Sequence, residues 1–136
     1  MAVTAGSIIT PQTPKAAVAG LTAANTTFTT SPTNSVLLVT AGANGARLTK
    51  LVAVPLEAIA TANNIQAYRS QDSGTTKYLF NAALMAVITP GAAVANAQTD
   101  FGYSDDNPLI LLANERIYMA EGQTEAVNVI AEWADY

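Results

Sequence analysis

From residue 35 onward, apolar residues recur with a period of two, in short runs separated by turn residues. The clearest run is the last one, where alternate positions are apolar: Val127, Val129, Ala131 and Trp133. This alternation is typical of a strand with one buried face. Short strands at this spacing indicate an antiparallel sandwich or barrel, so we predict an all-β fold, a jelly-roll-like antiparallel β-sandwich of about eight strands.

The strongest local signal lies around the dipeptide Asn44-Gly45. Asn-Gly favours the positive φ angles of a type I′ turn, and it separates the apolar segments Ser35–Ala41 and Ala46–Leu56. The pattern therefore predicts a hairpin. In its second strand two sets of residues point to opposite faces: Leu48, Val52 and Val54 on one, Arg47, Thr49 and Leu51 on the other. The predicted core consists of Val36, Leu38, Leu48, Val52, Val54, Ile117, Val127 and Val129.

Further strands are expected from β-branched or alternating segments bounded by Gly, Pro, Asn and Asp. They are Asn64–Ser70, a strand from Lys77 into Ala82–Pro90, Leu109–Leu112 and Glu115–Glu121. The segment Gln71–Thr76 reads as a turn, and Phe101–Pro108 as a turn-rich loop. Gly91–Gln98 reads as a small-residue loop or a short helix.

The first 34 residues have a different composition. They are rich in Thr, Ala and Pro, carry Lys15 as their only charge, and contain three prolines that disfavour a helix or an interior strand. Ser7–Thr10 fits a short edge strand. We therefore divide the chain into an extended N-terminal arm, residues 1–34, and a β-sandwich domain, residues 35–136. We expect the arm to be an attachment device outside the core.

Charge is scarce. Only 12% of the residues are charged and 50% are hydrophobic, against about 25% charged in an ordinary soluble domain. A domain of this size cannot bury half of its residues, so the composition favours a chain that lives inside an assembly. The net charge of -4, without a basic cluster, argues against nucleic acid or a membrane as partner. No apolar run is long enough to span a bilayer.

The few charges are unevenly distributed. Residues 100–136 carry eight acidic residues against one basic residue, Arg116, whereas the rest of the chain is net positive. This distribution is either a solvated acidic face or a set of complementary faces that meet between subunits. In a ring of identical subunits, two different faces of each subunit meet head to tail. Because the uneven charge fits this requirement, we predict a homo-oligomer, a trimer.

The chain lacks the residues of the common catalytic centres. Without His or Cys it cannot form a Ser-His-Asp or Cys-His arrangement, and we expect no enzymatic activity, no catalytic residue and no cofactor. The segment around Gly42, Gly45 and Arg47 lacks the ending of a phosphate-binding loop. Closely spaced oxygen ligands in Asp100–Asn107 leave a calcium site open as an alternative to ordinary turn chemistry. Asn25 begins a glycosylation sequon.

The C-terminal segment Leu109–Tyr136 resembles the ends of small structural proteins encoded among the head genes of tailed bacteriophages. The resemblance is carried by an apolar strand, a hairpin step of the form Ala-Asn-x-Arg-Ile-Tyr and a final alternating strand that ends in Asp-Tyr. The matching residues are Ala113, Asn114, Arg116, Ile117, Tyr118, Asp135 and Tyr136. It covers about the last fifth of the chain, and the uncharged Thr- and Ala-rich start is similar in style to the arms of virion proteins.

The resemblance implies a capsid decoration (cement) protein. Its partners would be the major capsid protein and further copies of itself, and its place the outer surface of the virion, after assembly in the host cytoplasm. A tail, neck or fibre-attachment component is the alternative among virion proteins. A carbohydrate-binding β-sandwich is the alternative of another class, since Tyr and Trp side chains can line a sugar site.

Overall fold

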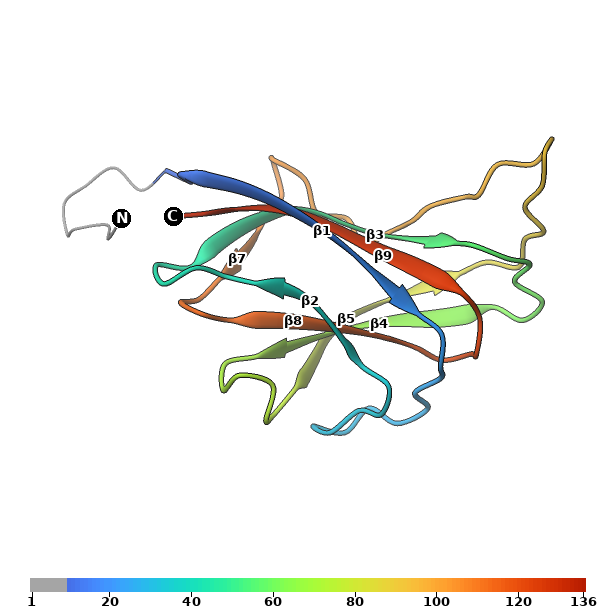
Figure 1. Cartoon of the computed structure of the whole chain (residues 1–136), viewed down its shortest axis with the longest axis horizontal. Helices are drawn as coiled ribbons and strands as arrows, with labels where there is room; N and C mark the ends of the chain where they lie inside the picture. The colour runs from blue at the N-terminus through green and yellow to red at the C-terminus, as the bar shows by residue number, and fades with distance from the viewer. Residues whose placement is uncertain (1–9) are drawn as a thin grey trace.

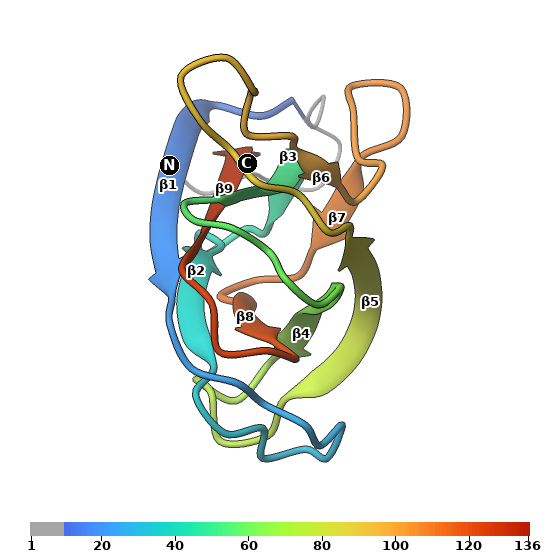
Figure 2. The ribbon, with the colours of Figure 1, turned by 90° about the vertical axis from the view of Figure 1, so that its right-hand side faces the viewer.

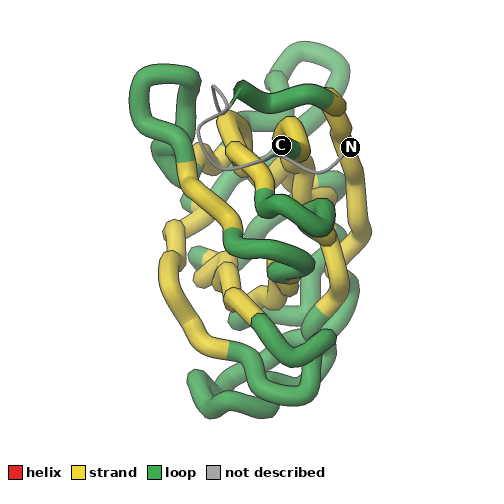
Figure 3. Tube along the Cα trace, turned by 90° about the vertical axis from the view of Figure 1, so that its left-hand side faces the viewer, coloured by secondary structure: helices red, strands yellow, loops and turns green. Residues whose placement is uncertain are grey.

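The structure, a computed structural model, describes residues 10–136. These residues form strands and loops without any helix (Figure 3). The strands make two antiparallel sheets that pack against each other (Figure 1), so the predicted all-β sandwich is confirmed. No helix in the described part of the chain is long and apolar enough to cross a membrane.

Nine strands of the described residues build the two sheets. The first sheet contains β1 (Thr13–Leu21), β9 (Val127–Asp135), β3 (Ala46–Pro55), β6 (Thr99–Asp100) and β7 (Leu109–Leu111). The second sheet contains β2 (Val36–Thr40), β8 (Arg116–Glu121), β4 (Asn63–Ser70) and β5 (Tyr78–Met85). In the first sheet β9 lies between β1 and β3, and β6 and β7 both pair with β3.

The strand pairs nest inside one another along the chain. β1 pairs with β9, β2 with β8, β3 with β6 and β7, and β4 with β5. Successive pairs fall in alternate sheets, and Figure 2 shows the two resulting layers from one end. The hairpin of β4 and β5 is the innermost pair, so every other pair joins segments that are distant in sequence.

The core lies between the two sheets. Five predicted core residues belong to its main cluster: Leu38, Leu48, Ile117, Val127 and Val129. Val36 is partly buried and packs against the cluster. Val52 is buried but does not belong to the cluster, and Val54 is half-buried.

Strand β3 departs from the predicted alternation because of a β-bulge. Its register with β9 shifts between Leu48 and Lys50, so Thr49 is an extra residue on β3. An extra residue exchanges the two faces of the strand beyond it. Leu51 is therefore fully buried in the core, contrary to the prediction that placed it opposite Leu48.

The predicted hairpin between Ser35–Ala41 and Ala46–Leu56 is wrong, although both strands exist. β2 and β3 lie in different sheets, and the turn at Asn44-Gly45 carries the chain from one sheet to the other. Gly45 has the positive φ of 87°, whereas Asn44 does not have the positive φ that a type I′ turn requires. β2 instead pairs with β8, and β3 with β9, which buries both strands against the same core.

The boundary of the N-terminal arm also differs from the prediction. Thr13–Leu21 is a strand of the sandwich that pairs with β9 along its whole length, and Leu21 is buried in the core. Pro14 lies in this edge strand, where a missing N–H is tolerated. The predicted edge strand Ser7–Thr10 lies outside the described residues except for Thr10. Residues 13–34 therefore belong to the folded unit.

The bulge makes a testable distinction between neighbouring positions of β3. We expect Leu51→Ala to lower the free energy of unfolding by about 2–5 kcal/mol, because it leaves a cavity in the core. Val54→Ala, at a half-buried position, should cost about 1 kcal/mol. Urea denaturation of both variants checks this, and a larger loss at Val54 than at Leu51 would contradict the bulge.

Candidate functional site

Asp100 and Asn107 use their side chains within the acidic loop that left calcium open as an alternative. Asp100 accepts the Gly102 N–H at 2.9 Å, and Asn107 donates its side-chain amide to the Gly102 carbonyl at 3.0 Å. Asp105 pairs with Arg47 of β3 at 3.5 Å. Within residues 10–136, no three acidic side chains gather in a way that could hold a metal ion.

The turn that follows β2, around Gly42, is anchored to the C-terminal strand β9. Asp135 accepts the Gly42 N–H at 3.0 Å and lies 2.6 Å from the ammonium group of Lys15. A Cβ at Gly42 would lie 3.0 Å from the Asp135 carboxyl, so this close approach explains the glycine. These contacts tie β1, β9 and the turn together at one end of the sandwich.

The sequon residue Asn25 is fully buried and belongs to a polar network. Its amide nitrogen lies 2.7 Å from the side-chain oxygen of Gln66 and 3.0 Å from the Tyr68 hydroxyl, and its oxygen accepts the Thr33 N–H. Gln66 and Tyr68 face away from the core, since they alternate along β4 with Ile65 and Ala67 of the core cluster. Asn25 and Thr27, in the connection between β1 and β2, contact them. Because the amide is buried and bonded, Asn25 has a structural role in the folded protein.

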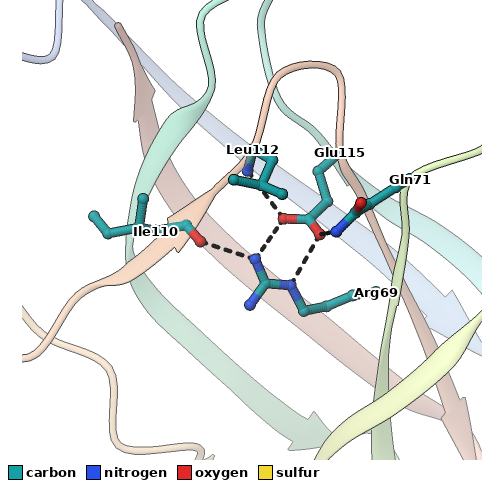
Figure 4. Close-up of polar contacts among 5 residues, drawn as sticks. All are labelled: Arg69, Gln71, Ile110, Leu112 and Glu115. Carbon is teal, nitrogen blue, oxygen red and sulfur yellow. Dashed lines mark hydrogen bonds and ion pairs between the residues drawn. The ribbon is translucent and has the colours of Figure 1, made fainter.

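The most extensive charged cluster joins β4 to the loop before β8 (Figure 4). Arg69 holds the fully buried carboxylate of Glu115 through two nitrogens, at 3.0 and 2.5 Å. The Leu112 N–H and the Gln71 amide also donate to this carboxylate, and Arg69 donates to the Ile110 carbonyl. Burial raises the pKa of Glu115, but the hydrogen bonds from Arg69 and Leu112 outweigh it, so the pKa lies below its ordinary value.

A second buried carboxyl lies at the opposite end of β8. Glu121 is fully buried, and it accepts a hydrogen bond from Asn63 at 2.9 Å while its other oxygen, Oε1, has no hydrogen-bond partner. Burial raises the pKa of Glu121 to about 7; the Asn63 hydrogen bond opposes this, and the charges of Glu125 and Glu57 add to it. Unlike Glu115, this carboxyl has no basic partner in the described residues.

The alternation in β8 explains both buried acids. Residues 115, 117, 119 and 121 share one face of an extended chain, and Ile117 and Met119 on that face are in the core. The sequence predicts that Ile117 and Met119 share one face of a strand. Because strand faces repeat every two residues, the same face includes Glu115 before them and Glu121 after them.

The most exposed part of the second sheet is an apolar row on β5. Leu79, Ala82 and Leu84 lie opposite Tyr68, Gln66 and Asn64 of β4, on the face that points away from the core. Leu84 is 68% exposed, and Val87, just beyond the strand, is 62% exposed. The other face of β5 is covered, since Asn81 donates to the Tyr103 hydroxyl and Phe101 packs against the core.

Sequence reasoning predicted the strand over this segment but did not find the row. Both faces of β5 carry Ala and Leu or Met, so the sequence does not mark which face is buried. Two aromatic residues, Tyr68 and Tyr118, lie opposite each other on β4 and β8, and Tyr68 also lies opposite Leu79 at one end of the row. Trp133 is in the core, Tyr68 is in the polar network, and Tyr118 lies beneath Lys77, whose nitrogen is 4.6 Å from the ring centroid.

Comparisons with protein-family models, with curated proteins and with solved structures found no match for this chain.

The paired carboxylate should be important for stability. We expect Arg69→Met to lower the free energy of unfolding by about 3–5 kcal/mol at pH 7, because it leaves the buried Glu115 carboxylate without its partner. Glu115→Gln should cost less, because the Arg69 side chain that it leaves unpaired is 28% exposed. The matched control is Lys50→Met, which breaks the exposed Lys50–Glu132 pair and should cost about 0–1 kcal/mol. Equal losses in chemical denaturation would show that the cluster is not a buried ion pair.

The raised pKa of Glu121 predicts that the protein loses stability as the pH rises. The folded pKa of about 7 lies above the ordinary 4.5, so between these values the folded chain keeps a proton that the unfolded chain has released. The stabilising contribution is complete below pH 4.5 and is lost as the pH rises through 7.

We therefore expect Glu121→Gln to be more stable than the native chain at pH 8, by up to about 3 kcal/mol, and to differ little from it at pH 4. Urea denaturation at both pH values checks this. Glu132→Gln, at an exposed position, is the control. A variant that gains no stability between pH 4 and pH 8 relative to the native chain would contradict the assignment.

Proposed function

We propose that this protein is a structural component of a bacteriophage virion, a capsid decoration (cement) protein that binds and stabilises the outer surface of the head. The observation that carries the proposal is the exposed apolar row of Leu79, Ala82 and Leu84 on β5. Exposed apolar patches on small domains mark interaction sites. A lattice of shell subunits is the partner that the C-terminal resemblance suggests.

The strand pairing supports a finer fold assignment, which is that the sandwich is a jelly roll. A jelly roll contains eight strands in two sheets and arises from a long antiparallel ribbon that is rolled up. Counting β6 and β7 as one interrupted strand beside β3, the chain has eight strand positions in nested pairs. Jelly rolls occur in viral capsid domains and in lectins, so this assignment fits the proposal by analogy of fold alone.

The basic side chains support the exclusion of nucleic acid and of an anionic membrane as partners. Four of the six basic side chains form ion pairs within the chain. Of the others, Lys77 lies over the Tyr118 ring and Arg116 donates to the Ser73 carbonyl. Few basic groups are therefore available to bind nucleic acid or an anionic membrane.

We further propose that the protein acts as a homotrimer on the shell. Glu57 and Glu125 lie near one end of the sandwich, where β3 ends and β9 begins. Lys77 and Arg116 lie near the other end, beside the turn between β4 and β5. Faces of opposite charge suit the head-to-tail contacts of a ring.

Binding to purified heads tests the function. We expect Leu84→Lys to weaken binding to stripped heads by about tenfold or more, equivalent to 1.4 kcal/mol, because it places an ammonium group in an apolar contact. The control is Leu56→Lys, which changes an exposed leucine in the connection after β3. Heads to which the native protein is added back should also resist heat better than stripped heads.

Two outcomes would overturn the proposal. If the native protein leaves the heat resistance of heads unchanged and fractionates with tails in few copies, it is a tail or neck component. If it binds an immobilised glycan and no particle, it is a carbohydrate-binding module.

A further inference from the structure

Each sheet has two edges, and the strands at three of these edges carry features that prevent pairing with another chain. β6 and β7 are two and three residues long, and very short edge strands offer little to pair with. β2 is interrupted by a bulge at Leu38, and β5 by a bulge at Phe80, as the register shifts against β8 and β4 show. A bulge twists an edge away from a flat partner.

The edge formed by β1 carries such protection only at its start, where Pro14 and Lys15 lie. β1 is nine residues long and pairs with β9 in one unbroken register. Its only charge is Lys15, near its start, and that ammonium group is bound to Asp135 of the same chain. Residues 16–21 contain no charge and no proline. Soluble proteins usually guard such an edge with charged residues, proline or a bulge.

The most exposed apolar side chain of β1 lies at its centre. Val18 is 63% exposed on the outer face of the first sheet. It lies opposite Ile130 of β9, which lies opposite Val52 of β3. Val52 is 3% exposed and Ile130 is half-buried. The row is thus increasingly exposed toward the open edge, as expected if a further strand continues it.

The sequence of β1 is self-complementary about Val18. Small residues stand at equal distances on both sides, Ala17 and Ala19 first, then Ala16 and Gly20. A second β1, running antiparallel and centred on Val18, therefore brings small residues opposite small residues and the two valines opposite each other. A two-fold interface requires a patch that is complementary to itself.

The charges are compatible with this arrangement. Antiparallel pairing centred on Val18 places Lys15 of one strand opposite Leu21 of the other, so the two lysines are far apart. Leu21 lies opposite Val127, two residues after Glu125, and Glu57 accepts the Ala126 N–H there. The lysine end of each copy thus meets the acidic end of its partner, and no like charges are opposed.

We propose that β1 pairs with β1 of a second copy of this chain, forming a two-fold dimer in which the two first sheets become one continuous sheet. The contact is separate from the proposed function. It uses the free edge of the first sheet, and it leaves the apolar row on β5 open for shell contacts.

Disulfide trapping tests the register. Directly opposed residues of an antiparallel pair have Cβ atoms about 4.5–5.5 Å apart, within reach of a disulfide after small adjustment. The native chain has no cysteine, so Val18→Cys introduces a single thiol. Under mild oxidation we expect Val18→Cys to form a covalent dimer and Leu56→Cys, an exposed control, to remain largely monomeric. Equal cross-linking of the two variants would overturn the proposal.

Sedimentation with a charge exchange tests the contact without a covalent bond. The native protein should sediment as a dimer at about 100 µM. Val18→Lys should raise the Kd for dimer dissociation by about tenfold or more, and Leu56→Lys should leave this Kd unchanged. Mixing Val18→Lys with Val18→Glu should restore dimers, because opposite charges then face each other across the two-fold axis.

Unchanged unfolding midpoints in urea would show that the substitutions at this exposed position leave the fold intact. A native protein that is monomeric at this concentration, or an oligomer that Val18→Lys does not weaken, would overturn the two-fold pairing. Neither result bears on head binding, which the Leu84 variant tests separately.

Discussion

The sandwich depends on the position of β9 between β1 and β3. This one strand contributes Val127, Val129, Ala131 and Trp133 to the core and supplies the hydrogen-bonding partner for both neighbours. Because β9 is the last strand and β1 the first, their pairing closes the outermost of the nested pairs. Such long-range pairing has a high loop-closure cost and is typical of slowly folding β-proteins. The first sheet is therefore complete only when β1 pairs with β9.

The two buried carboxyl groups at the ends of β8 show how the same strand geometry leads to opposite electrostatics. Glu115 and Glu121 both face the interior at opposite ends of the strand. Arg69 of β4 reaches Glu115, whereas the residue of β4 that reaches Glu121 is the neutral Asn63. One carboxyl is held ionised and the other is driven toward the protonated form. Acid should therefore weaken one end of the sandwich and strengthen the other.

The low charge content has a structural counterpart in the surface. Apolar side chains are exposed both on β5 and on β1, while most basic groups are occupied within the chain. A chain of this kind has little electrostatic means to attract a distant partner but has exposed apolar surfaces that gain stability when covered. This combination suits a protein whose partners are held at high local concentration, as on a particle, where weak contacts act together.

Most strands were predictable from the sequence because their signal is local. The alternation in Val127–Asp135 and the turn residues after Ser70 arise within a few residues, and the structure contains both the strand and the turn. Which strands pair was not predictable in the same way. The segments on either side of Asn44-Gly45 read as a hairpin, yet each pairs with a distant strand, because pairing is decided by how two sheets bury a common core.

The buried acids, the bulge and the edge strand also divide into what the sequence predicts and what only the structure shows. The pattern of β8 predicts by itself which acids face the interior, but it does not show that Arg69 lies beside one of them. The bulge at Thr49, which moves Leu51 into the core, has no signature in a segment that is apolar on both faces. The inclusion of Thr13–Leu21 in the first sheet depends on the free edge of β9. The sequence by itself determined the strand periodicity and the scarcity of charge, since both are properties of neighbouring residues and of composition. Only the tertiary structure decided the partners, the register and the exposed faces, since these depend on contacts between segments far apart in the chain.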